Sequence, residues 1–226
     1  MCGREWDLLA EVFAPIYSPS TGVALDFLGF PGPAERSRGG SMLEIGCGTG
    51  VIAVSAALSG YERVVAADIN PNAVRNAALN VERHGVSGSV RCLRSDLFEG
   101  IDRQERFDLI FWSSNYVMAP AGYSHRSPHE MAYVDPGYQA HRRFLADVPN
   151  RLLPGGQALL HFCTRGDLFE LVRLAEECGR EIGILRRRTV QEGQDQVEHF
   201  LLEVKARPVD TARRSVARTP AASLVS

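Results

Sequence analysis

Glycines at alternate positions mark the segment LEIGCGTG, residues 43–50, where an apolar run turns into a helical pattern. Because glycine has no Cβ atom, such a backbone can turn sharply and lie against a ligand. Asp68 ends the next apolar run, where a carboxylate can accept both hydroxyls of a ribose. Asp96 ends the run after that, in RSDLF, and could accept a hydrogen bond from the exocyclic amine of a purine. Taken as strand ends in series, these groups indicate a nucleoside site, although a glycine turn alone could serve packing only.

The spacing of the glycines and the acid before them distinguish between nucleoside cofactors. A dinucleotide site prefers G-x-G-x-x-G, which seats a pyrophosphate at a helix N-terminus. Here the third glycine comes one residue early, and Glu44 precedes the loop. A carboxylate there would repel a pyrophosphate but would suit an ammonium or sulfonium group. The pattern therefore favours S-adenosylmethionine (SAM) over NAD.

These residues depend on strands and helices that alternate from residue 41 onward. Strands are expected over 41–46, 63–68, 89–96, 107–112 and 157–163, helices over 51–58, 71–85, 138–152 and 168–178, and a closing antiparallel pair over 181–190 and 197–205. Two short helices are expected before them, over 4–13 and from about Thr21. This alternation predicts an α/β, Rossmann-like fold. Its mostly parallel seven-stranded sheet should have an antiparallel edge hairpin and N-terminal lid helices. The expected organisation is a helical cap over 1–40, a SAM-binding domain over 41–205 and a disordered tail over 206–226.

Composition limits the classes of function. A chain of 226 residues, 45% hydrophobic and 23% charged, is typical of one soluble globular domain. Its net charge of −2 gives no reason to expect a nucleic-acid or membrane partner. The five cysteines form no CxxC pair, which favours reduced thiols and a cytoplasmic location. Neither a signal peptide nor a membrane span is expected from the sequence, and it does not predict the oligomeric state.

The E-x-G-x-G-x-G loop, the acid after the second strand and the S-D-L after the third resemble a class I SAM-dependent methyltransferase. The sequence is most similar to the PrmC/HemK-type protein-glutamine methyltransferases, especially their short eukaryotic release-factor form, from about residue 16 to 205. The segments IYSPSTGVALDFL, ADINPNAVRNAALN and LLPGGQALL match that family's motifs. The resemblance implies the class I methyltransferase fold and SAM as the cofactor. The residues expected to bind it are Tyr17, Glu44, Gly46, Cys47, Gly48, Asp68, Ile69, Asp96 and Leu97.

The acceptor motif departs from that family. Its F-D-L-I-x-x-N-P-P-Y becomes FDLIFWSSNY, so that Ser113 replaces the asparagine, Ser114 and Asn115 replace the prolines, and Tyr116 is kept. A serine lacks the paired donor and acceptor with which an amide can bind a glutamine side chain. We therefore expect an acceptor other than glutamine. Asn115 and Tyr116 are the catalytic candidates for orienting the nucleophile, with Ser113 as a third, although Asn115 could simply be a turn residue.

Tyrosines are concentrated beyond this motif. Tyr123, Tyr133 and Tyr138 follow Tyr116 closely, and they predict a substrate pocket lined by phenols, unless the stretch is an ordinary surface loop. The histidines between them lack metal-ligand spacing, so no metal site is expected. Trp112 is expected in the core, because a strand residue before the motif should face packed side chains.

Three functions remain open from the sequence. The first is a small-molecule N- or O-methyltransferase of specialised metabolism that releases S-adenosylhomocysteine. The second is a SAM-consuming cyclase that forms azetidine-2-carboxylate and methylthioadenosine, similar to the azetidine-2-carboxylate synthases. The third is a protein glutamine methyltransferase or a non-catalytic SAM-binding partner. The first is preferred, with a small molecule as the partner.

Overall fold

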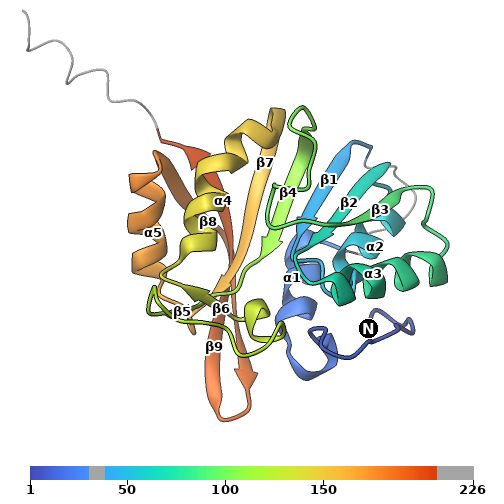
Figure 1. The fold of residues 1–226 in the computed structure, drawn as a ribbon, viewed down its shortest axis with the longest axis horizontal. Helices are drawn as coiled ribbons and strands as arrows, with labels where there is room; N and C mark the ends of the chain where they lie inside the picture. Colours follow the sequence, from blue (N-terminus) through green and yellow to red (C-terminus); the bar gives the residue numbers. More distant parts are fainter. Residues whose placement is uncertain (31–38, 208–226) are drawn as a thin grey trace, which may run out of the picture.

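A single seven-stranded sheet forms the centre of the computed structural model, which describes residues 1–30 and 39–207 (Figure 1). The strands are β1 (Ser41–Ile45), β2 (Arg63–Asp68), β3 (Val90–Arg94), β4 (Phe107–Ser113), β7 (Leu152–Cys163), β8 (Arg180–Glu192) and β9 (Asp195–Ala206). Their order is β3-β2-β1-β4-β7-β9-β8; the first five are parallel, and β9 is antiparallel to β7 and β8. The mostly parallel sheet and its antiparallel edge pair confirm the predicted fold class.

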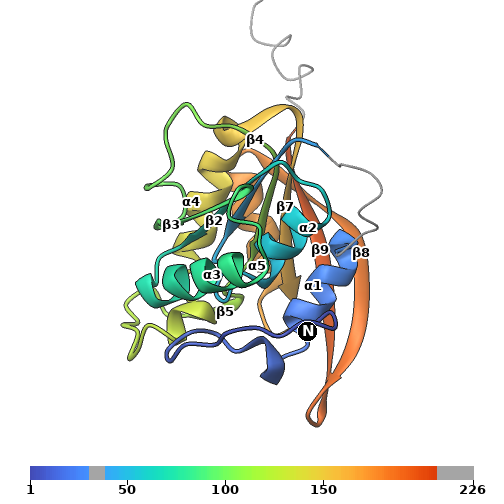
Figure 2. The ribbon, with the colours of Figure 1, turned by 90° about the vertical axis from the view of Figure 1, so that its right-hand side faces the viewer.

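Helices cover both faces of the sheet (Figure 2). They are α1 (Ser20–Leu28), α2 (Val51–Leu58), α3 (Pro71–Arg83), α4 (Gln139–Asp147) and α5 (Leu168–Glu177), with 3-10 turns η1 (Pro15–Tyr17), η2 (Glu130–Ala132) and η3 (Val148–Arg151). Residues of α1, α2 and α3 pack in one hydrophobic cluster, and residues of α4 and α5 pack in another. Successive residues of β4 alternate between the two clusters, as the pleat of a strand buried on both faces requires.

The order of the strands fixes where a ligand can bind. From β1 the chain proceeds outward to β2 and β3, and then returns to the other side of β1 as β4. In open α/β sheets, ligands bind at the carboxyl ends of the strands where the order reverses in this way. The candidate residues follow β1, β2, β3 and β4, so the fold brings them to one edge.

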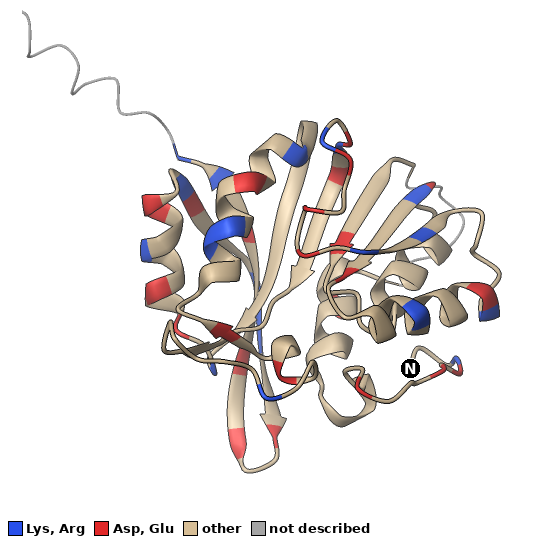
Figure 3. Ribbon diagram, viewed as in Figure 1, with Lys and Arg blue, Asp and Glu red and all other residues tan. Residues whose placement is uncertain are grey.

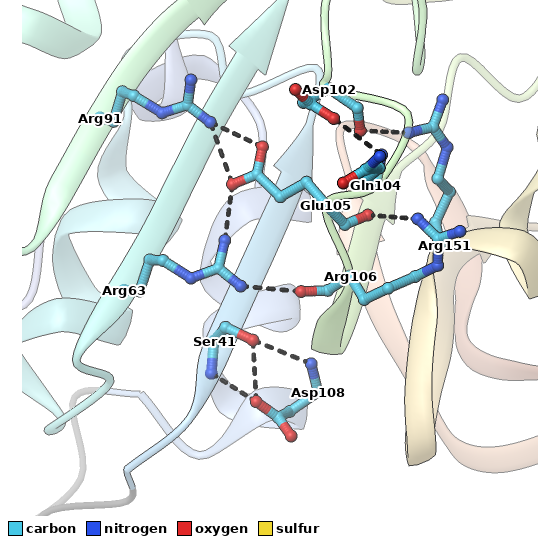
Figure 4. A network of polar contacts seen from close by, with 9 residues as sticks. All are labelled: Ser41, Arg63, Arg91, Asp102, Gln104, Glu105, Arg106, Asp108 and Arg151. Atoms are coloured by element: carbon cyan, nitrogen blue, oxygen red, sulfur yellow. Dashed lines mark hydrogen bonds and ion pairs between the residues drawn. The ribbon is translucent and has the colours of Figure 1, made fainter.

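The opposite edge, at the amino ends of these strands, is held by polar contacts (Figure 4). The Asp108 carboxylate accepts hydrogen bonds from the backbone N–H and the hydroxyl of Ser41, at 2.7 and 2.8 Å. Glu105 pairs with Arg63 and Arg91, at 2.6 and 2.8 Å. Thus β1, β2 and β3 are tied to the segment around the start of β4, far along the chain.

The helix predicted over residues 4–13 is wrong, because residues 1–14 contain no helix. Two buried side-chain amides of α3 form hydrogen bonds with the backbone of this segment instead. Asn80 and Asn76 accept hydrogen bonds from the N–H groups of Asp7 and Leu9, at 2.8 and 2.7 Å, and both donate to the Asp7 carbonyl. Such side-chain bonds replace those of a helix, so the segment lies extended along α3. The second expected helix forms as α1.

A small parallel pair, β5 (Val117–Ala119) and β6 (Val134–Pro136), was not predicted. It brackets the tyrosine-rich stretch and fixes it beside the end of β4. The expected tail from residue 206 lies outside the described residues except for the end of β9 and Arg207. Among the described helices, none has both the length and the apolar character needed to cross a bilayer.

Candidate active site

A cavity of about 340 Å³ opens at the carboxyl ends of β1, β2 and β4. Its walls come from the glycine loop, the ends of these strands, the N-terminal segment and the stretch between β5 and β6. Of the residues expected to bind the cofactor, it is lined by Glu44, Gly46, Cys47, Gly48, Asp68, Ile69, Asp96 and Leu97. Ser113, Asn115, Tyr116 and Tyr133 line it too, so the structure brings the predicted cofactor and acceptor groups together.

The loop needs its glycines for conformation and for close approach. Gly46 has φ of +66°, a left-handed conformation, and a Cβ atom there would lie 3.5 Å from the Trp112 indole nitrogen. A Cβ atom on Gly50 would lie 2.9 Å from the Ala77 Cα atom of α3. The loop therefore passes tightly between α3 and the ring of Trp112. That ring is buried as expected, and it also forms part of the cavity wall.

Asp68 both shapes the loop and faces the cavity. Its carboxylate accepts hydrogen bonds from the N–H groups of Gly48 and Asn70, at 2.9 and 2.8 Å. Burial raises the pKa of this carboxyl, although these backbone bonds oppose the rise. Each carboxylate oxygen has two lone pairs, so both can still accept a hydroxyl of a ribose.

Glu44 is 2% exposed and accepts a hydrogen bond from the Ala53 N–H, in the first turn of α2, at 2.8 Å. Burial raises its pKa well above the usual value, and the nearby Asp68 charge adds to the rise. A cationic group bound in the cavity would favour the ionised form. Burial likewise raises the pKa of the Cys47 thiol, which keeps it neutral and suits the small filler expected from the sequence.

Asp96 lines the cavity, but its carboxylate already has a partner. Arg143 of α4 donates to both oxygens of Asp96, at 2.9 and 3.1 Å, and also pairs with Glu99. An exocyclic amine bound here must share this carboxylate with the guanidinium. Nothing in the sequence pattern of α4 indicated that Arg143 would reach the site.

The segment after β4 presents an unpaired polar atom. The Asn115 side chain donates to the Val134 carbonyl at 3.1 Å, whereas its Oδ1 atom is buried and has no hydrogen-bond partner. Tyr116 follows it, and burial raises the pKa of its phenol, which therefore stays protonated and can donate. The Ser113 hydroxyl lies 3.0 Å from Nδ1 of His161 on β7.

Three of the expected tyrosines do not line the cavity. Tyr17 is 85% exposed and borders a second hollow beside the first. Tyr123 donates to Glu130 at 3.0 Å, away from the cavity. Tyr138 is fully buried behind the cavity wall, where its hydroxyl donates to the Tyr116 carbonyl at 2.7 Å.

The N-terminal segment contributes residues that sequence reasoning missed. Glu11, Phe13 and Pro15 line the cavity, and the Phe13 ring lies 5.5 Å from that of Tyr133. Because residues 4–13 were read as a helix, nothing in the pattern could have placed these side chains over the site.

Comparison with known proteins identifies relatives of this chain. The family model for ribosomal protein L11 methyltransferase (PrmA) matches residues 21–115. A ribosomal protein L11 methyltransferase of Pelotomaculum thermopropionicum is 47% identical over 72 residues, 32% of this chain and 23% of that protein. A release factor glutamine methyltransferase of Bordetella pertussis is 34% identical over 122 residues, 51% of this chain and 44% of that protein. The chain thus spans less than half the length of either relative.

The fold also matches solved structures. The E. cuniculi Mtq2-Trm112 complex, described as responsible for methylation of the eRF1 translation termination factor, superposes with a TM-score of 0.59 at 20% identity. The match covers 87% of this chain and 99% of that chain. At this identity the likeness shows the fold alone.

These relatives correct one expectation and confirm others. The prediction of a small molecule as the only substrate is wrong, because the release factor enzyme and the Mtq2 complex are named for acting on proteins. Cyclisation of SAM finds no support in these names. The expected transferase class and SAM cofactor agree with them. The chain is therefore similar to SAM-dependent methyltransferases of class I, and release factor glutamine methyltransferases are among the proteins that it resembles.

Proposed function

We propose that this chain transfers the methyl group of SAM to a side-chain nitrogen of a protein, with an amide as the acceptor. The observation that carries the proposal is the buried, unpaired Oδ1 atom of Asn115, a residue that lines the cavity. A buried acceptor without a partner costs free energy, so the site is stabilised by a ligand that offers an N–H group.

A primary amide suits the two groups at the end of β4. Its N–H can donate to Oδ1 of Asn115, while its carbonyl can accept from the protonated phenol of Tyr116 in place of the hydrogen bond that this phenol makes with the Cys163 thiol. The family asparagine supplies both functions from one side chain at the position of Ser113. Here two neighbouring residues share them, which removes the objection that a serine cannot hold an amide.

The cofactor groups favour a SAM molecule oriented for transfer. Asp68 and Glu44 both line the cavity, where the Asp68 carboxylate would accept the ribose hydroxyls and the Glu44 carboxylate would favour the positive charge of the bound cofactor. Transfer is then an in-line displacement, in which holding the nitrogen against the methyl carbon can lower the barrier by up to roughly 7–11 kcal/mol.

Support for a protein acceptor comes from the named substrates of the relatives and from the hollow next to the cavity. Tyr116 and Tyr133 border both spaces, so a side chain reaching Asn115 could belong to a segment lying in the second hollow. Basic and acidic residues are interspersed along α3, α4 and α5 (Figure 3), consistent with a partner other than nucleic acid.

The test uses the purified full chain and radiolabelled SAM, with the peptide-chain release factor and ribosomal protein L11 of the same organism as separate acceptors. Label on a glutamine of the release factor, mapped by mass spectrometry, is the expected result. Label on an amine of L11 would instead make an amine the acceptor. Asn115→Ala should abolish transfer while the SAM affinity stays unchanged.

Full transfer by Asn115→Ala would contradict the role of Oδ1. Methylthioadenosine formed from SAM alone would contradict methyl transfer itself. A matched control is Asn150→Ala, since Asn150 is an exposed amide that does not line the cavity.

A further inference from the structure

A chain of hydrogen bonds crosses the sheet from the acceptor site to the second hollow. The Ser113 hydroxyl lies 3.0 Å from Nδ1 of His161, and Nε2 of His161 lies 3.0 Å from Nδ1 of His199. Nε2 of His199 lies 3.0 Å from a carboxylate oxygen of Glu192. Ser113 lines the cavity, and Glu192 borders the second hollow, so the chain joins two solvent-facing spaces through the interior.

Adjacent strands bring these residues together. Ser113 of β4 is in register with His161 of β7, and His199 of β9 is in register with Cys163, two residues further along β7. The two imidazole rings are nearly parallel, at an angle of 9°, and each residue is 1% exposed. The Phe27 ring of α1 covers His161, with ring centroids 6.2 Å apart. The pair is therefore held in a fixed geometry away from water.

The direction of every hydrogen bond follows from the carboxylate at the end. An ionised Glu192 can only accept, so Nε2 of His199 must carry the proton. Nδ1 of a neutral His199 is then an acceptor, so Nε2 of His161 must also carry a proton. That leaves Nδ1 of His161 to accept from the Ser113 hydroxyl, and the lone pairs of Ser113 remain available to the cavity.

The surroundings keep both rings neutral. Burial lowers the pKa of His161 to about 3, and the neighbouring His199 contributes to the shift. Burial also lowers the pKa of His199, against the opposing effect of Glu192. The other charged group acting on the pair is Arg165, which donates to the second oxygen of Glu192 at 3.0 Å.

We propose that Ser113, His161, His199 and Glu192 form a proton relay that removes the proton released by methyl transfer. The proposal rests on the proposed function, since an amide nitrogen must lose a proton when it is methylated. It gives Ser113 a catalytic role that Asn115 and Tyr116 cannot fill, because Asn115 has no titratable group and Tyr116 holds its proton.

The step balances as follows. The nitrogen lone pair forms a bond to the methyl carbon while the carbon–sulfur bond breaks and leaves its electron pair on sulfur, which becomes a neutral thioether. The N–H proton moves to Oγ of Ser113 as the hydroxyl proton moves to Nδ1 of His161. The Nε2 proton of His161 moves to Nδ1 of His199, and the Nε2 proton of His199 moves to Glu192. Both rings stay neutral throughout, and each changes from the tautomer protonated at Nε2 to the one protonated at Nδ1. Proton exchange with solvent restores the starting tautomers after the product leaves.

The first experiment measures the tautomers directly and needs no acceptor. Long-range proton–nitrogen NMR correlations on the full chain with ¹⁵N-labelled histidine should show both rings neutral and protonated at Nε2. A proton on Nδ1 of His161 would make that ring the donor to Ser113, and it would overturn the proposal. A charged ring in either position would overturn it too.

The second experiment measures turnover with the release factor as acceptor. Glu192→Gln can still accept from His199 but cannot take its proton, so kcat should fall on the order of 10²-fold with KM and SAM affinity unchanged. Asp195→Asn is the matched control, because Asp195 also pairs with Arg165 but makes no contact with His199, and it should leave kcat unchanged. An undiminished kcat in Glu192→Gln would overturn the relay.

Variants of Ser113 separate the relay from a structural role. Ser113→Ala should lower kcat as Glu192→Gln does, Ser113→Thr should restore it, and the Ser113→Ala, Glu192→Gln double variant should be no slower than either alone, since both changes interrupt one path. Additive losses would contradict a single path.

If neither candidate protein is methylated, the proposed function fails, while the tautomer measurement still decides the direction of the relay.

Discussion

At the scale of single residues, Asp68 has two tasks, because its carboxylate holds the glycine loop and faces the cavity. Asp68→Ala removes charge-assisted acceptors for the ribose, so SAM binding should weaken by about 2–3 kcal/mol in calorimetry. Asp147→Ala removes an exposed carboxylate that does not line the cavity, and it should leave the affinity unchanged. Equal affinities in the two variants would show that Asp68 does not bind the ligand.

Glu44 should make the stability of the chain depend on pH. Unfolded chains ionise a glutamate near pH 4.3, about the reference value, whereas burial makes folded Glu44 retain its proton to a higher pH. Between these values the folded state binds more protons, so the free energy of unfolding falls as pH rises. Glu44→Gln cannot ionise, so its stability relative to the natural chain should increase through this window, by about 1.4 kcal/mol for each unit of pKa shift.

Denaturant unfolding at a series of pH values measures this difference for Glu44→Gln. The matched control is Glu82→Gln, an exposed glutamate on α3, whose profile should run parallel to that of the natural chain. Parallel profiles for Glu44→Gln as well would contradict the argument.

The sequence could predict those site residues that lie close together along the chain. The glycine loop, Asp68 and Asp96 each lie within one strand-to-helix turn, so their spacing along the chain is enough. The Ser113–His161–His199 contacts join three strands, and no local pattern indicates which histidine will face which serine. Arg143 and Phe13 were missed for the same reason, since their contacts with the site depend on tertiary packing.

At the scale of elements, the N-terminal segment is held along α3 by two amides rather than by a hydrophobic face. Asn80→Ala removes hydrogen bonds to the backbone of Asp7 and to the Thr49 carbonyl, and leaves those groups with fewer partners. The free energy of unfolding should fall by about 1–3 kcal/mol. Residues 1–14 should also become more susceptible to limited proteolysis.

Glu82→Ala on the exposed side of α3 is the control for this variant and should change neither measurement. Unchanged proteolysis in Asn80→Ala would show that other contacts hold the segment.

Sequence periodicity predicted the central strands β1, β2 and β4 well, because each is a run of mostly buried residues between breaker residues. It failed for residues 4–13, where apolar residues at helical spacing suggested a helix. Asn76 and Asn80 supply the competing hydrogen bonds, and they lie some 70 residues away. The β5–β6 pair was missed because strands of three residues carry too little pattern.

At the scale of the whole molecule, two hydrophobic clusters share one sheet, so they should unfold together. Trp112 belongs to one cluster and Trp6 packs against the other, which makes them independent fluorescence reporters. Leu160→Ala leaves a cavity in the Trp112 cluster and should cost about 2–5 kcal/mol. In single-tryptophan variants, both reporters should shift to lower denaturant by the same amount.

Leu185→Ala, at a leucine that is 46% exposed, is the control and should shift neither transition substantially. A shift of the Trp112 transition alone would show that the two faces of the sheet unfold separately.

The polar contacts at the amino ends of the strands bear on how such an enzyme can diversify. Ser41, Asp108, Arg63 and Glu105 join β1, β2 and the start of β4 at the edge remote from the cavity (Figure 4). The scaffold is therefore anchored by residues that do not line the cavity. Replacements at the other edge, such as serines in place of an asparagine and a proline, can accumulate without loosening the strands. Substitutions at the carboxyl ends of the strands can thus change the acceptor during evolution, while the contacts at the amino ends preserve the fold.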